Sequence, residues 1–119
     1  MKCYDLKEIP SESPRPGLVR RAFRGDNVLM VWNELQPGMQ LRPHKHPFEQ
    51  VAYILAGRCR FHVGDETFEA GPGSVFRIPP DVMHYGEPVG TEVCVNLDVF
   101  SPPREDYLHM VEYQKAERG

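Results

Sequence analysis

Glycine and proline divide this chain into short segments along its whole length. Its 119 residues include 10 glycines and 12 prolines, and both residue types favour turns over long regular elements. Between the turns lie short runs rich in β-branched and aromatic residues, spaced by about 8–12 residues, which is typical of sandwiches and barrels. We expect strands at 28–32, 50–56, 58–63, 67–70, 74–78 and 92–100. The pattern therefore predicts an all-β fold.

The length fits one domain, at about 100–200 residues per domain. Residues 1–17 contain several prolines, so this lead-in is expected to be extended or loose rather than helical. Residues 18–100 hold the expected strands and would form the β-barrel itself. In residues 101–119, Ser101 is placed to cap a helix that begins with Pro102, which predicts a short helix and a C-terminal tail.

The charge balance excludes some classes of partner. The chain has 14 Lys and Arg against 17 Asp and Glu, a net charge of −3, and so lacks the excess of basic residues that nucleic-acid binding requires. No apolar run approaches the ~18 residues of a membrane helix, and residues 1–5 do not begin a signal peptide. Three cysteines without a C-x-x-C motif favour a reduced cytoplasm, with Cys59 and Cys94 as small buried residues.

A pair of histidines, His44 and His46, is the first candidate for chemistry. Prolines on both sides of the pair exclude a helix. In an extended segment residues i and i+2 point the same way, so both imidazoles can approach one metal ion. Gln50 lies four residues after His46, an even offset, so it would share the face of the two histidines. His84 could complete the set from a neighbouring strand. An H-x-H pair alone is also compatible with two polar residues on an exposed face.

Two motifs in residues 38–84 resemble the signatures of the cupin superfamily. The first signature, G-x5-H-x-H-x3-E-x6-G, is matched by Gly38, His44, His46, Gln50 and Gly57. Most of the second, G-x5-P-x-G-x2-H-x3-N, is matched by Gly73, Pro79, Asp81 and His84. The resemblance implies a cupin barrel, the jelly roll also called a double-stranded β-helix, of about eight or more short strands. It also implies an internal metal site and a homodimer.

One residue departs from the ligand set of many cupins. Gln50 stands where many of them carry a glutamate, and the adjacent Glu49 has the wrong parity to face the interior. We therefore expect His44, His46, Gln50 and His84 to bind one divalent transition metal ion, with Ni, Mn, Fe, Co and Zn all compatible. Such a neutral set leaves the ion its full charge for an anionic ligand, and its open coordination positions indicate catalysis. A vestigial barrel with an empty site is the alternative.

The last expected strand carries a second group of polar residues. Asn96, Asp98 and Phe100 share one face of it, which must line the interior or meet solvent. The opposite face, Val95, Leu97 and Val99, is expected to be a packing face. An interior carboxylate near a metal can act as a general acid or base. Spacing alone also allows a simple surface pair between Asp98 and Arg104, a contact of little energetic value.

From Gly38 through Tyr107 the chain resembles the pectin-degradation cupins of the KdgF type, whose metal set is likewise two His, a Gln and a third His. The family motif D-x-F-x-P-x-R is matched by Asp98, Phe100, Pro102 and Arg104. The resemblance implies ring opening of 4,5-unsaturated uronates to linear 5-keto-4-deoxyuronate, in pectin or alginate catabolism. On this reading Asp98 transfers a proton, Arg104 holds Asp98 or clamps the substrate carboxylate, and Phe100 forms a wall for the sugar. A metal-dependent dioxygenase and a sugar-acid-binding cupin without turnover are the alternatives.

Two arginines on the expected strands have open roles. Arg60 alternates with Arg58 and His62 on a face that fits solvent or the barrel mouth, where Arg60 could meet an anion. Arg77 interrupts the apolar run 75–78, so it either lines the cavity or forms an ion pair.

Overall fold

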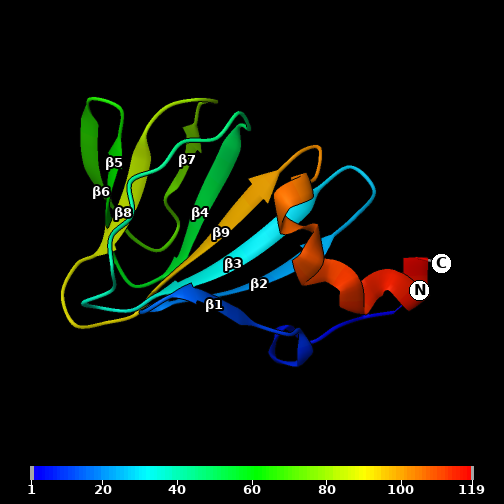
Figure 1. Ribbon diagram of the computed structural model, residues 1–119. Coiled ribbons are helices and arrows are strands. Elements are labelled where there is room, and N and C mark those ends of the chain that lie inside the picture. Colours follow the sequence, from blue (N-terminus) through cyan, green and yellow to red (C-terminus); the bar gives the residue numbers. More distant parts are fainter. Residues whose placement is uncertain (1, 119) are drawn as a thin grey trace.

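Two antiparallel sheets face each other and enclose the interior of the molecule (Figure 1). The computed structural model describes residues 2–118. The larger sheet has six strands in the order β1-β2-β3-β9-β4-β7, and the smaller has three in the order β6-β5-β8. The elements are η1 (Leu6–Glu8), β1 (Glu12–Arg15), β2 (Leu18–Arg24), β3 (Leu29–Leu35), β4 (Gln50–Ala56), β5 (Cys59–Val63), β6 (Glu66–Ala70), β7 (Val75–Ile78), β8 (His84–Pro88), β9 (Cys94–Phe100), η2 (Glu105–Gln114) and α1 (Lys115–Arg118). The predicted all-β fold is confirmed.

Strict alternation along the central strands determines which side chains reach the interior. In β3 and β9 every second residue is buried and the residues between are half-buried, as the period of two in a strand requires. In β4 the buried residues are Gln50, Ala52 and Ile54, which confirms the parity expected from the sequence. The inward positions include the polar residues Asn33, Asn96 and Asp98.

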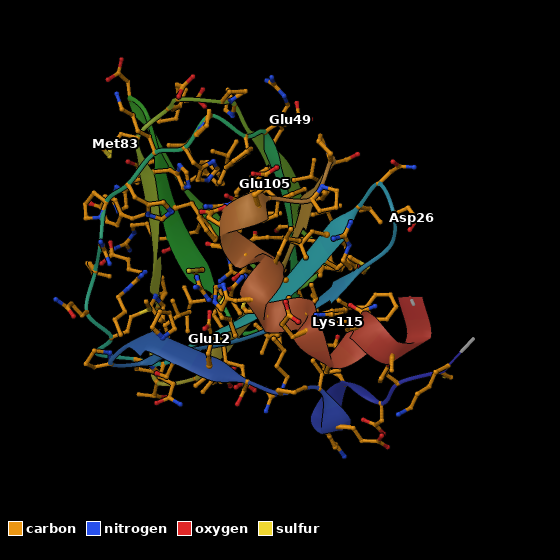
Figure 2. All side chains as sticks on the ribbon, turned by 45° about the vertical axis from the view of Figure 1, so that its right-hand side comes forward. Glu12, Asp26, Glu49, Met83, Glu105 and Lys115 are labelled. Carbon is orange, nitrogen blue, oxygen red and sulfur yellow. The ribbon has the colours of Figure 1, made fainter. Side chains whose placement is uncertain are left out.

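These polar residues separate two apolar clusters. The first cluster includes Leu35 of β3 and Cys94 of β9, and it packs between the two sheets. The second includes Val31 and Phe100, at the other ends of the same strands, together with residues of η2. Asn33 and the pair Asn96 and Asp98 lie between the clusters, so each strand changes from apolar to polar and back along its inward face. Side chains from both sheets project into the space between them (Figure 2). Cys59 and Cys94 are both fully buried, as expected.

The outer face of the large sheet is apolar along β9. Val95, Leu97 and Val99, the expected packing face, point outward there and are half-buried. The inward side of β9 is the one that carries Asn96 and Asp98, so parity places the apolar residues outside. They adjoin further apolar side chains, since Leu97 pairs with Trp32 on β3 and with Tyr53 on β4.

The two ends of the chain add short helical elements to the sheets. The expected N-cap at Ser101 is wrong: η2 begins at Glu105 with Arg104 at its N-cap, and the Ser101 hydroxyl donates to Asn27 O at 2.7 Å. The prolines at 102 and 103 delay the helix, because a residue preceding proline disfavours the α region. The lead-in contains the short η1 turn and the strand β1. No described helix is long and apolar enough to cross a membrane.

We predict that Gly57→Ala destabilises the fold much more than Gly90→Ala. Both glycines have positive φ, 71° and 85°, which costs an alanine about 1–2 kcal/mol. At Gly57 a Cβ would also lie 2.3 Å from Val93 O, whereas at Gly90 it would meet nothing within 4 Å. Urea unfolding should therefore show an extra loss of about 1–3 kcal/mol for Gly57→Ala. Equal losses for the two variants would contradict the backbone contact described here.

Candidate metal centre

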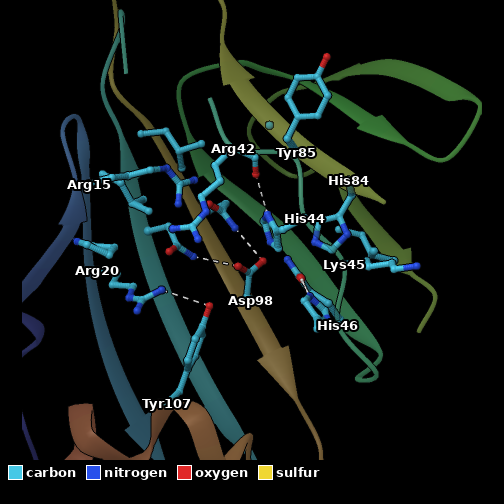
Figure 3. Close-up of a pocket in the computed structure, with 18 of the residues that line it drawn as sticks. Arg15, Arg20, Arg42, His44, Lys45, His46, His84, Tyr85, Asp98 and Tyr107 are labelled. Carbon is cyan, nitrogen blue, oxygen red and sulfur yellow. Dashed lines mark hydrogen bonds between the residues drawn. The ribbon is translucent and has the colours of Figure 1, made fainter. Parts of the chain in front are cut away.

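Three histidines from two segments meet inside the barrel. The backbones of His44 and His84 form an isolated antiparallel bridge, with N–H···O distances of 3.1 and 2.8 Å. His46 follows two residues later on the same side, and its ring centroid lies 4.9 Å from that of His84. One ligand atom from each of the three side chains lies within 4.8 Å of the others, a spacing suited to one metal ion (Figure 3). The structure thus brings together the three histidines predicted from the motifs.

The backbone fixes which nitrogen of each ring faces the centre. Nδ1 of His44, His46 and His84 lies 2.8, 2.9 and 2.8 Å from a backbone carbonyl oxygen two residues away. A carbonyl oxygen only accepts, so each Nδ1 must carry the hydrogen. In a neutral ring, Nε2 then holds a lone pair, which is the form in which imidazole binds metals.

The Nε2 atom of His84 supplies a direct test of whether a metal fits. It is buried and has no hydrogen-bond partner among the described residues. A buried polar atom without a partner costs about 1–3 kcal/mol, and such atoms are rare in folded proteins. A metal ion bound to the three Nε2 atoms would satisfy this lone pair. The donor set therefore fits a divalent transition metal.

Gln50 approaches the same point from β4. Its Oε1 lies 3.1 Å from His46 Nε2, while its amide also hydrogen-bonds the Asp98 carboxyl group. An amide that donates its N–H to Asp98 presents its oxygen to His46. Two lone pairs then face each other, an arrangement that a shared cation would stabilise. This geometry supports the predicted place of Gln50 beside the three histidines.

Burial keeps the three imidazoles neutral. Loss of hydration lowers the pKa of His44, His46 and His84, and that of His84 falls to about 4. The neighbouring imidazoles and Arg104 act in the same direction on His84. Neutral rings are ready to bind a metal near pH 7, because no proton has to be released first.

Asp98 lies in the centre of the cavity and is held by amide side chains. Its two carboxyl oxygens accept hydrogen bonds from Asn33 Nδ2 at 2.9 Å and from Asn96 Nδ2 at 2.8 Å (Figure 3). Burial nevertheless dominates, and it raises the pKa of Asp98 to about 7. A carboxyl group with this pKa is populated in both protonation states at neutral pH, as proton transfer requires.

Arg104 pairs with Asp106. Of its two expected roles, holding Asp98 or clamping a substrate carboxylate, the first is not made by a direct hydrogen bond in the described part of the chain, because Nε and Nη2 donate to Asp106 at 3.1 and 2.7 Å. Asp106 is two residues away and matches the guanidinium in a bidentate pair. Arg104 also lies 3.8 Å above the Tyr107 ring and 4.9 Å above that of Phe100. Phe100 is buried under Arg104 and beside His46, where it forms part of the cavity wall.

The residues with open roles lie outside the cavity. Arg77 is exposed and pairs with Glu49, so the ion pair is the one of its two alternatives that the structure shows. Arg60 pairs with Glu69 at 3.2 Å on the solvent side of the small sheet. His62 lies on the same face and contacts Glu87 at 2.9 Å. Arg60 and His62 thus lie on the solvated face that their alternation in β5 indicated.

A cavity of about 390 Å³ connects the three histidines with the N-terminal strands. This volume is at the small end of the range for small-molecule sites. Its lining includes residues that the motif analysis did not predict, namely Arg15, Arg20, Asn33, Arg42 and Tyr107. Asn33 could have been found as a polar residue on the buried face of β3. No local sequence pattern indicated that Arg15, Arg20 and Arg42 line the cavity, because they come from three separate segments that only the tertiary fold brings together.

We predict that His84→Ala lowers the affinity for Zn²⁺ at least about 100-fold, since even changes next to metal ligands cost 10–100-fold. Isothermal titration of the chelator-treated protein with Zn²⁺ measures this. His62→Ala is the matched control, because it removes an imidazole outside the cavity, and its affinity should stay within about twofold of wild type. Unchanged Zn²⁺ affinity in His84→Ala would show that the metal binds elsewhere.

We also predict that the metal-free protein loses stability as the pH rises through about 7. Burial raises the pKa of Asp98 from 3.8 to about 7, so the folded state holds this proton more tightly than the unfolded chain. The stabilisation is complete below about pH 4 and is lost as the pH rises through about 7. Urea unfolding between pH 5 and 9 should show this loss as a difference between wild type and Asp98→Asn, because the lowered pKa values of the three histidines favour the folded state as the pH rises toward about 6.5 in both proteins. The same pH dependence in the two proteins would show that Asp98 is not the group responsible.

Comparisons with known proteins place the chain in a family. Residues 35–109 match the model of the AraC-like ligand binding domain. An uncharacterized protein of Streptomyces coelicolor is 30% identical over 104 residues, which are 87% of this chain and 98% of that protein. KdgF from a Halomonas species superposes with a TM-score of 0.78 at 24% identity, over 88% of this chain and 98% of that one. An RmlC-like cupin from Shewanella frigidimarina superposes with a TM-score of 0.72 at 26% identity, over 85% and 90% of the two chains. The chain is thus a cupin and belongs to the family of AraC-like ligand binding domains.

Proposed function

We propose that this cupin is a metal-dependent enzyme that converts 4,5-unsaturated uronate monosaccharides to linear 5-keto-4-deoxyuronate. The observation that carries the proposal is a carboxyl group with a pKa of about 7, Asp98, held in the same cavity as three neutral histidines. The tail motif of the KdgF type and the similarity to the fold of KdgF support this choice of substrate.

His44, His46 and His84, through Nε2, and Gln50, through Oε1, would hold one divalent transition metal ion. When bound, the ion would act as a Lewis acid on a substrate oxygen. All four ligands are neutral, so they leave the full positive charge of the site to attract an anionic substrate. Nδ1–H bonds to the backbone orient the rings before the ion binds.

The reaction is an isomerisation, so one group that first donates a proton and then accepts one is sufficient. In the substrate, C4 and C5 form a vinyl ether; in the product, C4 is a methylene, C5 a ketone and C1 an aldehyde. C4 must therefore gain a proton, the anomeric hydroxyl must lose one, and the ring must open. The protonated Oδ of Asp98 gives its proton to C4, and the resulting carboxylate accepts the proton from the anomeric hydroxyl. Asp98 is therefore protonated both at the start and at the end of the cycle.

Arg104 and Phe100 would shape the cavity around the sugar. Asp106 and the aromatic rings hold the Arg104 guanidinium in one position. It would therefore present a fixed positive charge to the anomeric oxygen as that oxygen loses its proton. Phe100 supplies an apolar wall under this charge.

The similarity to small cupins also implies a homodimer. The outer face of the large sheet supports this part of the proposal, because Trp32, Tyr53 and Leu97 adjoin there as cross-strand neighbours. A contiguous apolar surface of this kind marks an interaction site. Sedimentation equilibrium should give twice the mass of one chain, and a monomer at all concentrations would contradict it.

We predict that Asp98→Asn retains Zn²⁺ but loses turnover about 10²–10⁴-fold, the usual contribution of general acid–base catalysis. The assay follows loss of the ultraviolet absorbance of the C4=C5 bond of the unsaturated monouronate. Asp65→Asn, an identical change in an exposed turn, is the control and should keep wild-type turnover. Wild-type turnover in Asp98→Asn would remove the assigned role.

Chelation separates this proposal from the alternatives. Ring opening should exceed the spontaneous rate only in the metal-loaded protein. Oxygen consumption in the Fe(II)-loaded protein would instead favour a dioxygenase, and tight binding of the uronate without product would favour a sugar-acid-binding cupin. Either result without ring opening would contradict the proposed function.

A further inference from the structure

The cavity has the opposite charge to the chain that forms it. The chain has a net charge of −3. Its cavity is lined by five basic side chains, namely Arg15, Arg20, Arg42, Lys45 and Arg104. Only two carboxyl groups lie among the lining residues, those of Asp98 and Asp106. A concentration of positive charge in a cavity attracts anions.

Three of these basic residues gather on one side of the cavity. Arg15 belongs to β1, Arg20 to β2, and Arg42 to the segment between β3 and β4. Arg15 Nε donates to Gln40 O at 3.1 Å and so ties β1 to the segment that carries Arg42. Figure 3 shows Arg15 and Arg20 across the cavity from the three histidines, with Asp98 between the two groups.

Two of the three arginines have no acidic partner among the described residues. Arg20 pairs with Glu12 at 2.7 Å, and its guanidinium lies 4.5 Å from the Tyr107 ring centroid. Among the described side chains, neither Arg15 nor Arg42 has a carboxylate oxygen within 4.0 Å. Burial lowers the pKa of Arg15, and the charges of Arg42 and Arg20 lower it further, so the three cations lie close enough to repel one another. An anion between them would relieve this repulsion.

Arg104 is less available to bind an anion in the cavity. Its Nε and Nη2 are bound to Asp106, and aromatic rings lie under its guanidinium. Arg15 has both terminal nitrogens unused by any hydrogen bond between described residues, and the same holds for the whole guanidinium of Arg42. A planar guanidinium with free N–H groups recognises a carboxylate through paired hydrogen bonds.

We propose that Arg15 and Arg42 form a carboxylate-binding subsite in the cavity, with Arg15 across from the three histidines and Arg20 as a fixed positive charge beside it. Its ligand is a monosaccharide-sized carboxylic acid whose hydroxyl or carbonyl oxygens extend toward the histidines. This assignment rests on the proposed function, because it states which end of the uronate lies where. The carboxylate is bound by arginine, and the sugar oxygens face the metal ligands.

This orientation agrees with the position of Asp98. In the unsaturated uronate, C4 is two bonds from the carboxylate carbon. A carboxylate held by Arg15 and Arg42 therefore places C4 near the middle of the cavity, where Asp98 lies between Arg15 and the histidines (Figure 3). The anomeric end then points away from the arginines. In this orientation the Asp98 carboxyl group lies near C4, the carbon that gains the proton.

Binding of saturated sugar acids, which contain no C4=C5 bond to react, tests the subsite without turnover. The Zn²⁺-loaded protein is titrated with D-galacturonate and D-glucuronate, and with D-galactose and D-glucose as neutral counterparts. The double variant Arg15→Gln/Arg42→Gln should bind the sugar acid at least about 10-fold more weakly than wild type does, as expected for lost charged hydrogen bonds. The comparison uses whichever of the two acids wild type binds. Affinity for the neutral sugars should not change. Arg77→Gln removes the same charge from an exposed residue outside the cavity and should behave as wild type.

Each outcome decides for or against the subsite. Wild-type affinity for the acid in the double variant, or no binding of either acid to wild type, would overturn it. Equal weakening of acid and neutral sugar would also overturn it, because that result indicates a damaged cavity. Unchanged Zn²⁺ affinity and circular dichroism of the double variant show that the fold and the metal ligands are intact.

The turnover assay separates failure of the subsite from failure of the proposed function. With the unsaturated uronate, the double variant should raise KM about 10-fold and leave kcat within about threefold. Ring opening with an unchanged KM would keep the proposed function and remove the subsite. Arginine-dependent binding of the acids without ring opening would keep the subsite and remove the proposed function.

Discussion

Three hydrogen bonds from imidazole Nδ1 to backbone carbonyl oxygens determine what this cavity can bind. They place a hydrogen on the outer nitrogen of His44, His46 and His84, and thereby direct three lone pairs to one point. The Nε2 of His84 is buried without a hydrogen-bond partner among residues 2–118, so the described part of the protein does not by itself satisfy this arrangement. The backbone thus supplies both the orientation of the ligands and their neutral state, and the rest of the site is arranged around the point where they meet.

The sheet alternation adds the second component of the site. The inward faces of β3 and β9 carry a polar layer between two apolar clusters, so a carboxyl group can be buried without opening the core. Asn33 and Asn96 satisfy the oxygens of Asp98, while burial raises its pKa to about 7. The amide of Gln50 connects this carboxyl group to the histidines. Positive charge from the N-terminal strands completes the far side of the cavity.

Local rules predicted most of the fold and the ligand positions, while tertiary contacts determined the rest. The parity of Gln50 with His46 is a property of an extended chain, and it held in β4. The same parity could not tell whether Val95, Leu97 and Val99 face the core, because both faces of β9 contain apolar residues. The partner of Arg104 depends on where η2 begins, which two consecutive prolines shift. Arg15 and Arg42 are 27 positions apart in number, and only folding of β1 against the segment after β3 brings them together.

The position of a bound metal ion tests the account most directly. A crystal of the Zn²⁺-loaded protein, with anomalous diffraction recorded on both sides of the zinc absorption edge, would locate the ion independently of the chain. We predict one peak about 2.0–2.2 Å from Nε2 of His44, His46 and His84 and from Oε1 of Gln50, with each Nδ1 still bound to its carbonyl oxygen. A peak at Nδ1, a peak outside the cavity, or no peak among the three histidines would contradict it.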